Sequence, residues 1–201
     1  MSLSIVDAMD ILSDEYGCSD YTDTGAITAL GTVSTSGNSN VLNGVNTGNI
    51  TTYLAIDDLV VIDYEHYTVT AVTTSTITID KTINIPNPKT WSYVKEDEAE
   101  DYKKEMNKRN RALSTANRLV VLYGCDENPM PENHKTAVAL LACRLYNGTF
   151  STIQKMNVTS ERIGDMSYTY SNQQMPPLPK DIIFLLGDCY NGGIQPDFFT
   201  R

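Results

Sequence analysis

Several residues whose types suit catalysis or metal binding lie close together in the first half of the chain. They are Asp57, Asp58, Asp63, Glu65 and His66. Carboxylates beside an imidazole can bind a metal ion or act as general acid and base, which points to a hydrolase or lyase. The same residue types are typical of a solvated turn, and Tyr64-Glu65 falls where a hairpin turn is expected. We expect the turn and keep the metal or catalytic site as the alternative.

Other patterns that carry chemistry are missing from the sequence or have a structural explanation. The second histidine, His134, lies near the start of a predicted helix with no cysteine or histidine nearby, so we expect a solvent-exposed cap. There is no Gly-x-Ser-x-Gly motif, and no glycine-rich phosphate loop precedes a helix. Glu161 and Asp165 have the residue types of a two-carboxylate mechanism, but a turn in which Asp165 bonds backbone amides explains them. We therefore predict a protein that is not an enzyme, without catalytic residues, metal or cofactor.

The charge balance of the chain bears on its partners. The 201 residues carry a formal net charge of −10, and 41% of them are hydrophobic, which is typical of a globular protein. Proteins that grip nucleic acid present basic residues to the phosphates, so an acidic chain is expected to repel DNA. Such a chain suits a wall past which DNA slides without sticking. No apolar run reaches the length of a transmembrane helix.

The N-terminus and the cysteines bear on where the chain is made. The first residues show no signal-peptide core, which predicts synthesis in the cytoplasm. The cysteines are widely spaced and form no Cys-x-x-Cys motif: Cys18, Cys125, Cys143 and Cys189. We expect all of them to be reduced.

The composition changes along the chain, and each zone predicts a different kind of secondary structure around the candidate residues. Residues 1–27 begin with an amphipathic helix that has Ser4 as its N-cap. Residues 28–95 are rich in Thr, Ser, Asn, Val and Ile, and their short alternating runs predict a small all-β sandwich or barrel. The runs are 31–35, 59–63, 67–72 and 76–80, with turns at 36–38, 43–44 and 63–66.

Helices are predicted again from Glu96 onward. An apolar stripe with a seven-residue repeat predicts a helix of about 28 residues that ends at Gly124. Arg109 interrupts this stripe. Either its stem lies on apolar neighbours while the guanidinium reaches water, or it forms a salt bridge across a subunit boundary. Two further helices are predicted, at about 132–147 and from Pro179 to Tyr190.

The segment between the last two helices, 159–170, contains a Gly-Asp turn followed by an alternating run. It resembles a signature of the head–tail connector (adaptor) family of tailed bacteriophages. In that family a Ser-Glu-x-Ile-Gly-Asp-x-Ser-x-x-Tyr run follows a helical bundle and precedes a short last helix. The residues that fit the run are Ser160, Glu161, Ile163, Gly164, Asp165, Ser167 and Tyr170.

Part of the β-rich zone resembles a small β-barrel module that recurs in phage structural proteins. Its pattern begins with Gly-Thr-Val, passes through an Asn- and Gly-rich hairpin and continues with three short apolar runs. The residues that fit are Gly31, Thr32, Val33, Asp58, Leu59, Ile62, Tyr67, Thr68, Val69, Val72, Thr76, Ile77, Thr78 and Ile79.

The connector resemblance implies an α+β fold, in which a helical bundle carries an all-β sandwich or barrel domain inserted after its first helix. The helical connector domain then comprises 1–27 and 96–190, the inserted β-domain 28–95, and a flexible C-terminal docking tail 191–201. The resemblance also implies a twelve-fold ring in the neck of the virion, beneath the portal protein. This ring extends the DNA channel, lets the genome pass without specific binding and supports the next neck protein, with no membrane involved.

The resemblance also implies two sets of contact residues. The portal-docking residues are Asp197, Phe198, Phe199 and Arg201, and two adjacent phenylalanines in a mobile tail are indeed typical of a docking peptide. The ring contacts are Arg109, Glu161, Arg162, Asp165, Tyr168 and Tyr170.

Two other functions stay open at this point. One is a hydrolase or lyase that uses the acidic cluster at 57–66. The other is a tail-associated binding module whose β-domain recognises a sugar or a host surface.

Overall fold

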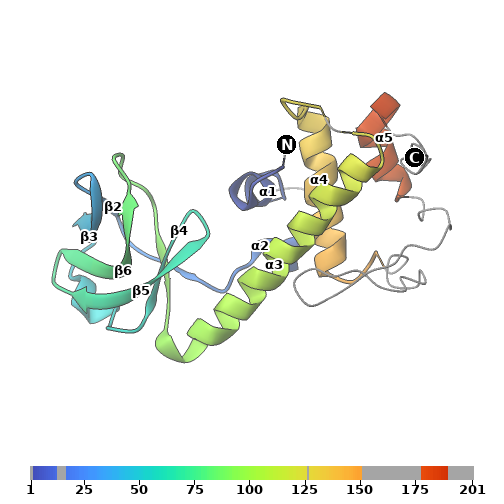
Figure 1. Ribbon diagram of the computed structural model, residues 1–201. Helices are drawn as coiled ribbons and strands as arrows, with labels where there is room; N and C mark the ends of the chain where they lie inside the picture. Colours follow the sequence, from blue (N-terminus) through green and yellow to red (C-terminus); the bar gives the residue numbers. More distant parts are fainter. Residues whose placement is uncertain (1, 13–16, 126, 151–177, 190–201) are drawn as a thin grey trace, which may run out of the picture. The chain divides into compact units, whose positions relative to one another are not determined.

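The computed structural model describes residues 2–12, 17–125, 127–150 and 178–189. The chain divides into two compact units, one of Met1–Thr22 with Lys108–Arg201 and the other of Asp23–Asn107. Helix α3 (Glu96–Leu122) contributes residues to both (Figure 1). The predicted domain limits of 27/28, 95/96 and 190/191 stay a prediction.

The unit Asp23–Asn107 contains one antiparallel sheet of seven strands. They are β1 (Ile27–Thr28), β2 (Thr32–Ser34), β3 (Asn38–Val45), β4 (Leu59–Ile62), β5 (Glu65–Val72), β6 (Thr76–Asn84) and β7 (Ser92–Val94), with the 3-10 helix η1 (Ile50–Thr52) between β3 and β4. The strand order is β1-β7-β4-β5-β6-β3-β2, so β1 and β2 end the sheet.

The predicted fold class, a helical bundle with an inserted all-β sandwich or barrel, is wrong. The chain is a mixed α/β protein whose strands form a single half-barrel sheet. The reason lies in β5, which pairs with β4 through residues 65–68 and with β6 through residues 69–72. The register shifts between Val69 and Ala71, and such a bulge bends a strand. One bent strand therefore joins two groups of strands into one sheet, where a sandwich needs two sheets face to face.

The Asn- and Gly-rich segment predicted as turns forms much of β3. Asparagine and glycine have low β propensity, but β3 is paired on both sides, with β2 and β6. Glycine suits position 44 because the side chain of Thr47 lies close to the backbone there and leaves no room for a Cβ. A Cβ there would lie 2.6 Å from Thr47 Oγ1.

An apolar core lies within this unit. Its buried side chains come from five of the seven strands and from the connecting segments: Val33, Leu42, Ile50, Leu54, Val60, Ile62, Tyr67, Val69, Ile77, Ile79, Ile85 and Trp91. Strands β1 and β7 contribute none of them, and both residues of β1 are exposed. Each such side chain stabilises the fold by about 1.5–3 kcal/mol. Trp91, the only tryptophan, also donates its indole N–H to Leu30 O at 3.3 Å.

The other unit is helical in its described part. It contains α1 (Ile5–Leu12), α2 (Ser19–Thr22), the second half of α3, α4 (Glu132–Tyr146), α5 (Lys180–Leu186) and the 3-10 helix η2 (Gly187–Cys189). The predicted N-cap of the first helix is confirmed, because Ser4 Oγ accepts the N–H of Asp7 at 3.2 Å. Helix α4 packs against both α1 and α5.

Bonds at both ends of α4 and α5 fix these helices as an antiparallel pair. At the start of α4, Asn133 Nδ2 donates to Leu185 O at 2.8 Å. At its end, both terminal nitrogens of Arg144 bind the carboxylate of Asp181, one of them at 2.9 Å. The last carbonyls of a helix have no intrahelical partner, and the Asn133 bond satisfies one of them.

Two disulfides cross-link the helical unit, so the prediction of reduced cysteines is wrong. Cys18 is bonded to Cys143 of α4, and Cys125, just after α3, is bonded to Cys189. The Cα atoms lie 6.0 and 5.0 Å apart, within the usual range for disulfides. The bonded cysteines are 125 and 64 residues apart in sequence, so no local spacing of cysteines indicates which of them pair.

Candidate functional site

Asp58 is the buried carboxylate of the acidic cluster, and its oxygens are engaged in structural bonds. They accept the backbone N–H groups of Ala55 at 2.9 Å and Glu96 at 3.0 Å, and the ammonium of Lys95 at 2.9 Å. Glu96 is the first residue of α3, and the first N–H groups of a helix lack intrahelical partners. Asp58 therefore acts as a cap that attaches the start of α3 to the loop before β4.

Asp63 and Tyr64 form the two-residue turn between β4 and β5, so a hairpin turn is confirmed, but one residue earlier than the predicted Tyr64-Glu65. Both have positive φ, 52° and 64°, as a type I′ hairpin requires. The carboxylate of Asp63 pairs with Lys89. Glu65 accepts the phenol O–H of Tyr67 at 2.6 Å, and burial raises the pKa of Tyr67, with this bond raising it further.

His66 lies on β5, and its ring meets that of Tyr102 edge-on with centroids 6.1 Å apart. Burial lowers the pKa of His66, and the positive charges of Lys103 and Lys81 lower it further. Among the described residues, no three His, Cys, Asp or Glu side chains gather as a metal site would require. The structure thus distributes the 57–66 cluster over a helix cap, a hairpin turn and a strand face.

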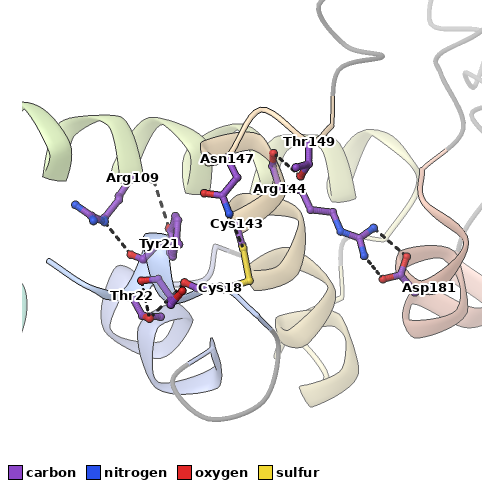
Figure 2. Close-up of a disulfide and its surroundings, with 10 residues drawn as sticks. Cys18, Tyr21, Thr22, Arg109, Cys143, Arg144, Asn147, Thr149 and Asp181 are labelled. Carbon is purple, nitrogen blue, oxygen red and sulfur yellow. Dashed lines mark hydrogen bonds and ion pairs between the residues drawn. A yellow bond between two sulfur atoms is a disulfide. The ribbon is translucent and has the colours of Figure 1, made fainter.

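Arg109 occupies the interior of the helical unit, with only 3% of its surface exposed. Figure 2 shows its guanidinium pointing at the short helix α2. Its Nε donates to Tyr21 O at 2.8 Å, and its Nη2 donates to Asp20 O at 3.1 Å. The alternative with the guanidinium in water is therefore wrong. The predicted contact with a neighbouring subunit stays a prediction.

Aromatic rings complete the environment of Arg109. Its guanidinium carbon lies 5.0 Å from the ring centroid of Tyr146, and Lys108 Nζ lies 4.2 Å from the same ring. Tyr21 meets Tyr146 edge-on at 5.4 Å and donates its O–H to Arg109 O at 3.4 Å. Burial raises the pKa of the Tyr21 phenol, although the nearby positive charge of Arg109 opposes that rise.

The Cys18–Cys143 disulfide holds the same short helix from its other end (Figure 2). Cys18 O accepts the N–H of Tyr21 at 2.8 Å and of Thr22 at 3.0 Å, which forms the single turn of α2. A four-residue helix is not stable by itself. The disulfide and the Arg109 bonds together fix α2, so this cluster has the properties of a structural clamp.

His134 is buried, so its prediction as a solvent-exposed cap is wrong. It is 5% exposed, and its Nε2 lies 3.2 Å from Leu186 O and 3.5 Å from Cys189 Sγ. Both contacts come from residues more than fifty positions away. No pattern near His134 in the sequence indicates them.

A shallow hollow of about 330 Å³ lies at the end of α3. It is lined by Ser2, Asn117, Arg118, Val121 and Leu122. Asn117 binds the N-terminal segment here, because it accepts Leu3 N–H at 2.8 Å and donates to Leu3 O at 3.2 Å. The hollow is mostly apolar and carries no pair of reactive groups.

Most of the predicted contact residues lie outside the described residues. These are the portal-docking residues Asp197, Phe198, Phe199 and Arg201, and the ring contacts Glu161, Arg162, Asp165, Tyr168 and Tyr170. The predicted docking tail 191–201 also lies there.

Two further observations bear on function. In the part of the chain that the structure describes, no helix has the length and apolar character needed to span a membrane. A comparison with protein-family models, curated proteins and solved structures finds no match to this chain.

Proposed function

We propose that this chain is a structural protein of the neck of a tailed bacteriophage, where it forms a ring that joins head and tail. The observation that carries the proposal is the run from Ser160 to Tyr170, which resembles the connector signature. Its position supports the same reading, since it follows α4 and precedes the short helix α5, as in that family.

The charge of the chain is compatible with this role. A net charge of −10 repels the phosphates of DNA, so a ring of such chains lets a genome pass without holding it. In this proposal the partners are the portal protein on one side, the next neck protein on the other, and identical copies around a twelve-fold ring. The C-terminal tail docks on the portal, and the repetition of a weak contact around the ring offsets the entropy lost on ordering each tail.

The enzymatic alternative has less support in the geometry. Asp58 binds two backbone N–H groups and a lysine, Asp63 pairs with Lys89, and Glu65 accepts from Tyr67. Alanine substitutions at Asp63, Glu65 and His66 separate the two functions. A connector with these changes still assembles infectious particles, whereas a hydrolase or lyase loses its activity.

The main test is to image necks of the parent phage at a resolution that traces the chain, with mass spectrometry of purified particles as a first step. We expect the chain in mature virions as a ring under the portal. Absence of the chain from purified particles would overturn the proposal, and so would turnover of a substrate by the isolated protein.

The docking tail is tested with filled heads that lack this protein. We expect a chain truncated after Asn191, or one with Phe198→Ala and Phe199→Ala, to stay folded and soluble and to lose binding to the heads. Phe184→Ala is the matched control, because Phe184 lies on α5 and is 84% exposed. Undiminished attachment of the truncated chain would contradict the docking assignment.

A further inference from the structure

The two disulfides differ in how far solvent reaches them. Cys18 and Cys143 are 4% and 3% exposed, so both sulfurs of that bond are buried. In the other bond Cys125 is 2% exposed, but Cys189 is only partly buried. Of the four disulfide-bonded cysteines, Cys189 is therefore the one residue that is not fully buried.

A buried imidazole faces the sulfur of Cys189. His134 lies in the first turn of α4, with Nε2 3.5 Å from Cys189 Sγ and 3.2 Å from Leu186 O. A carbonyl oxygen only accepts hydrogen bonds, so Nε2 carries the proton that faces both atoms. The imidazole thus presents a donor to the sulfur, and a histidine donor beside a sulfur stabilises the thiolate that forms when the bond breaks.

The surroundings also accommodate the reduced form. Cys189 Sγ lies 2.9 Å from Leu186 O, so a thiol at this position has an acceptor for its own proton. The pair of α4 and α5 keeps its other bonds after reduction, namely Asn133 with Leu185 and Arg144 with Asp181. The bond can therefore open without loss of the helix pair.

The geometry points to the Cys125–Cys189 bond as a site of thiol–disulfide exchange with small thiols, attacked at Cys189 and assisted by His134. This inference does not depend on the proposed function. A thiolate attacks Cys189 Sγ, the bond to Cys125 breaks, and Cys125 leaves as a thiolate that takes up a proton. A second thiolate attacks the outer sulfur of the mixed disulfide, and Cys189 leaves as a thiolate toward the Nε2–H of His134.

The overall reaction is balanced. Two thiols are oxidised to one disulfide, and the protein disulfide is reduced to two thiols, which receive the two protons. The Cys18–Cys143 bond is not part of this reaction, because neither of its sulfurs is accessible.

The first experiment exposes the oxidised full-length protein to reduced glutathione, stops samples with an alkylating reagent and maps the labelled cysteines by peptide mass spectrometry. We expect label on Cys125 and Cys189 first, with the transient glutathione adduct on Cys189 and the Cys18–Cys143 bond intact. If the Cys18–Cys143 bond opens first, or if both open together, the inference is wrong.

The second experiment tests the role of His134. We expect His134→Gln to slow the release of Cys189 from its glutathione adduct about tenfold, because His134 faces the leaving thiolate in that step. Tenfold is the factor in rate that one net hydrogen bond supplies. The glutathione adduct on Cys189 should then persist longer in the variant than in the wild type, which the same peptide mass spectrometry measures.

Asn133→Ala is the matched control for this variant. It removes the neighbouring bond to the end of α5 and leaves the imidazole in place, so the adduct on Cys189 should be released at the wild-type rate. A His134→Gln protein that releases Cys189 at the wild-type rate would refute the assignment. If that variant does not fold, the adduct mapping on the wild-type protein still decides whether Cys189 is the sulfur attacked.

Discussion

Replacing the buried Arg109 with methionine tests whether this residue stabilises the chain itself. Methionine keeps most of the volume of the stem but removes the donors to Tyr21 O and Asp20 O. It also removes the positive charge from the ring of Tyr146. The helical unit should therefore lose stability even when no other subunit is present.

The size of the effect follows from these contacts. Hydrogen bonds from a charged group contribute about 1.5–3 kcal/mol each, and a cation–π contact about 1 kcal/mol. Asp20 is exposed, so water replaces its lost donor, whereas Tyr21 is buried. Relief of the cost of burying the guanidinium offsets part of the loss. We therefore expect the variant to be less stable by about 2–4 kcal/mol.

The assay is urea unfolding of the isolated protein, followed by circular dichroism in the helix band. With an m value of about 2 kcal/mol/M, the expected loss lowers the midpoint by about 1–2 M. Arg111→Met is the matched control, because Arg111 is an exposed arginine on the same helix. Equal midpoints for the Arg109 and Arg111 variants would refute the clamp assigned to Arg109.

Three further predictions concern stability. Asp58→Asn should cost about 1–3 kcal/mol, because it removes the charge that caps α3, measured by urea unfolding with the fluorescence of the single tryptophan. Gly31→Ala should cost more than Gly37→Ala in the same assay. Both glycines have positive φ, 71° and 70°, but only the Cβ at position 31 would meet a carbonyl oxygen of β3, at 2.3 Å. Arg144→Met should lower stability by less than about 1 kcal/mol at pH 7, since its ion pair is partly exposed. The hydrogen bond from Arg144 lowers the pKa of Asp181, so the pair stabilises above the usual aspartate pKa, and the difference from wild type should vanish as pH falls through the lowered pKa of Asp181.

Each of these has an outcome that would contradict it. An Asp58→Asn protein as stable as the wild type would show that the cap is not needed. Equal losses of stability for Gly31→Ala and Gly37→Ala would mean that the close contact between position 31 and β3 does not destabilise the alanine variant. A difference in stability between Arg144→Met and wild type that grows as the pH falls would contradict the predicted direction of the pH dependence.

Local patterns in the sequence predicted the elements that depend on neighbouring residues. The alternation at 59–63, 67–72 and 76–80 corresponds to β4, β5 and β6, and the apolar stripe from Glu96 corresponds to α3. The Ser4 cap and the existence of a hairpin turn after β4 were also predicted correctly, although Glu65 and His66 of the predicted turn 63–66 belong to β5. In each case the side-chain period or the turn chemistry is contained in a few consecutive residues.

The sheet order and the short strands were not predictable in this way. β1 and β7 have two and three residues, and they exist because β1 pairs with β7 and β7 pairs with β4. β3 contains several residues that disfavour strands, yet it is paired on both sides. Pairing partners decide such elements, and a single sequence does not contain that information in local form.

The candidate sites also combine features that neighbouring residues indicate with contacts that depend on distant parts of the chain. Arg109 was noticed because it interrupts an apolar stripe, but its acceptors lie 88 and 89 positions away. The contact of His134 with Cys189 spans 55 positions. Such contacts form only after the helices pack, so residue type and spacing indicated that Arg109 is unusual without indicating what it binds.

The two disulfides interleave along the chain, since Cys125 lies between Cys18 and Cys143, and Cys189 lies beyond them. Any single break of the backbone between the first and last cysteine is therefore spanned by at least one sulfur bridge. A protease that nicks a loop of the sheet releases no fragment, and the nicked chain migrates as one band until a reductant is added. The cross-links of the helical unit thus keep the strand unit covalently tethered after such a cut, although no cysteine lies within it.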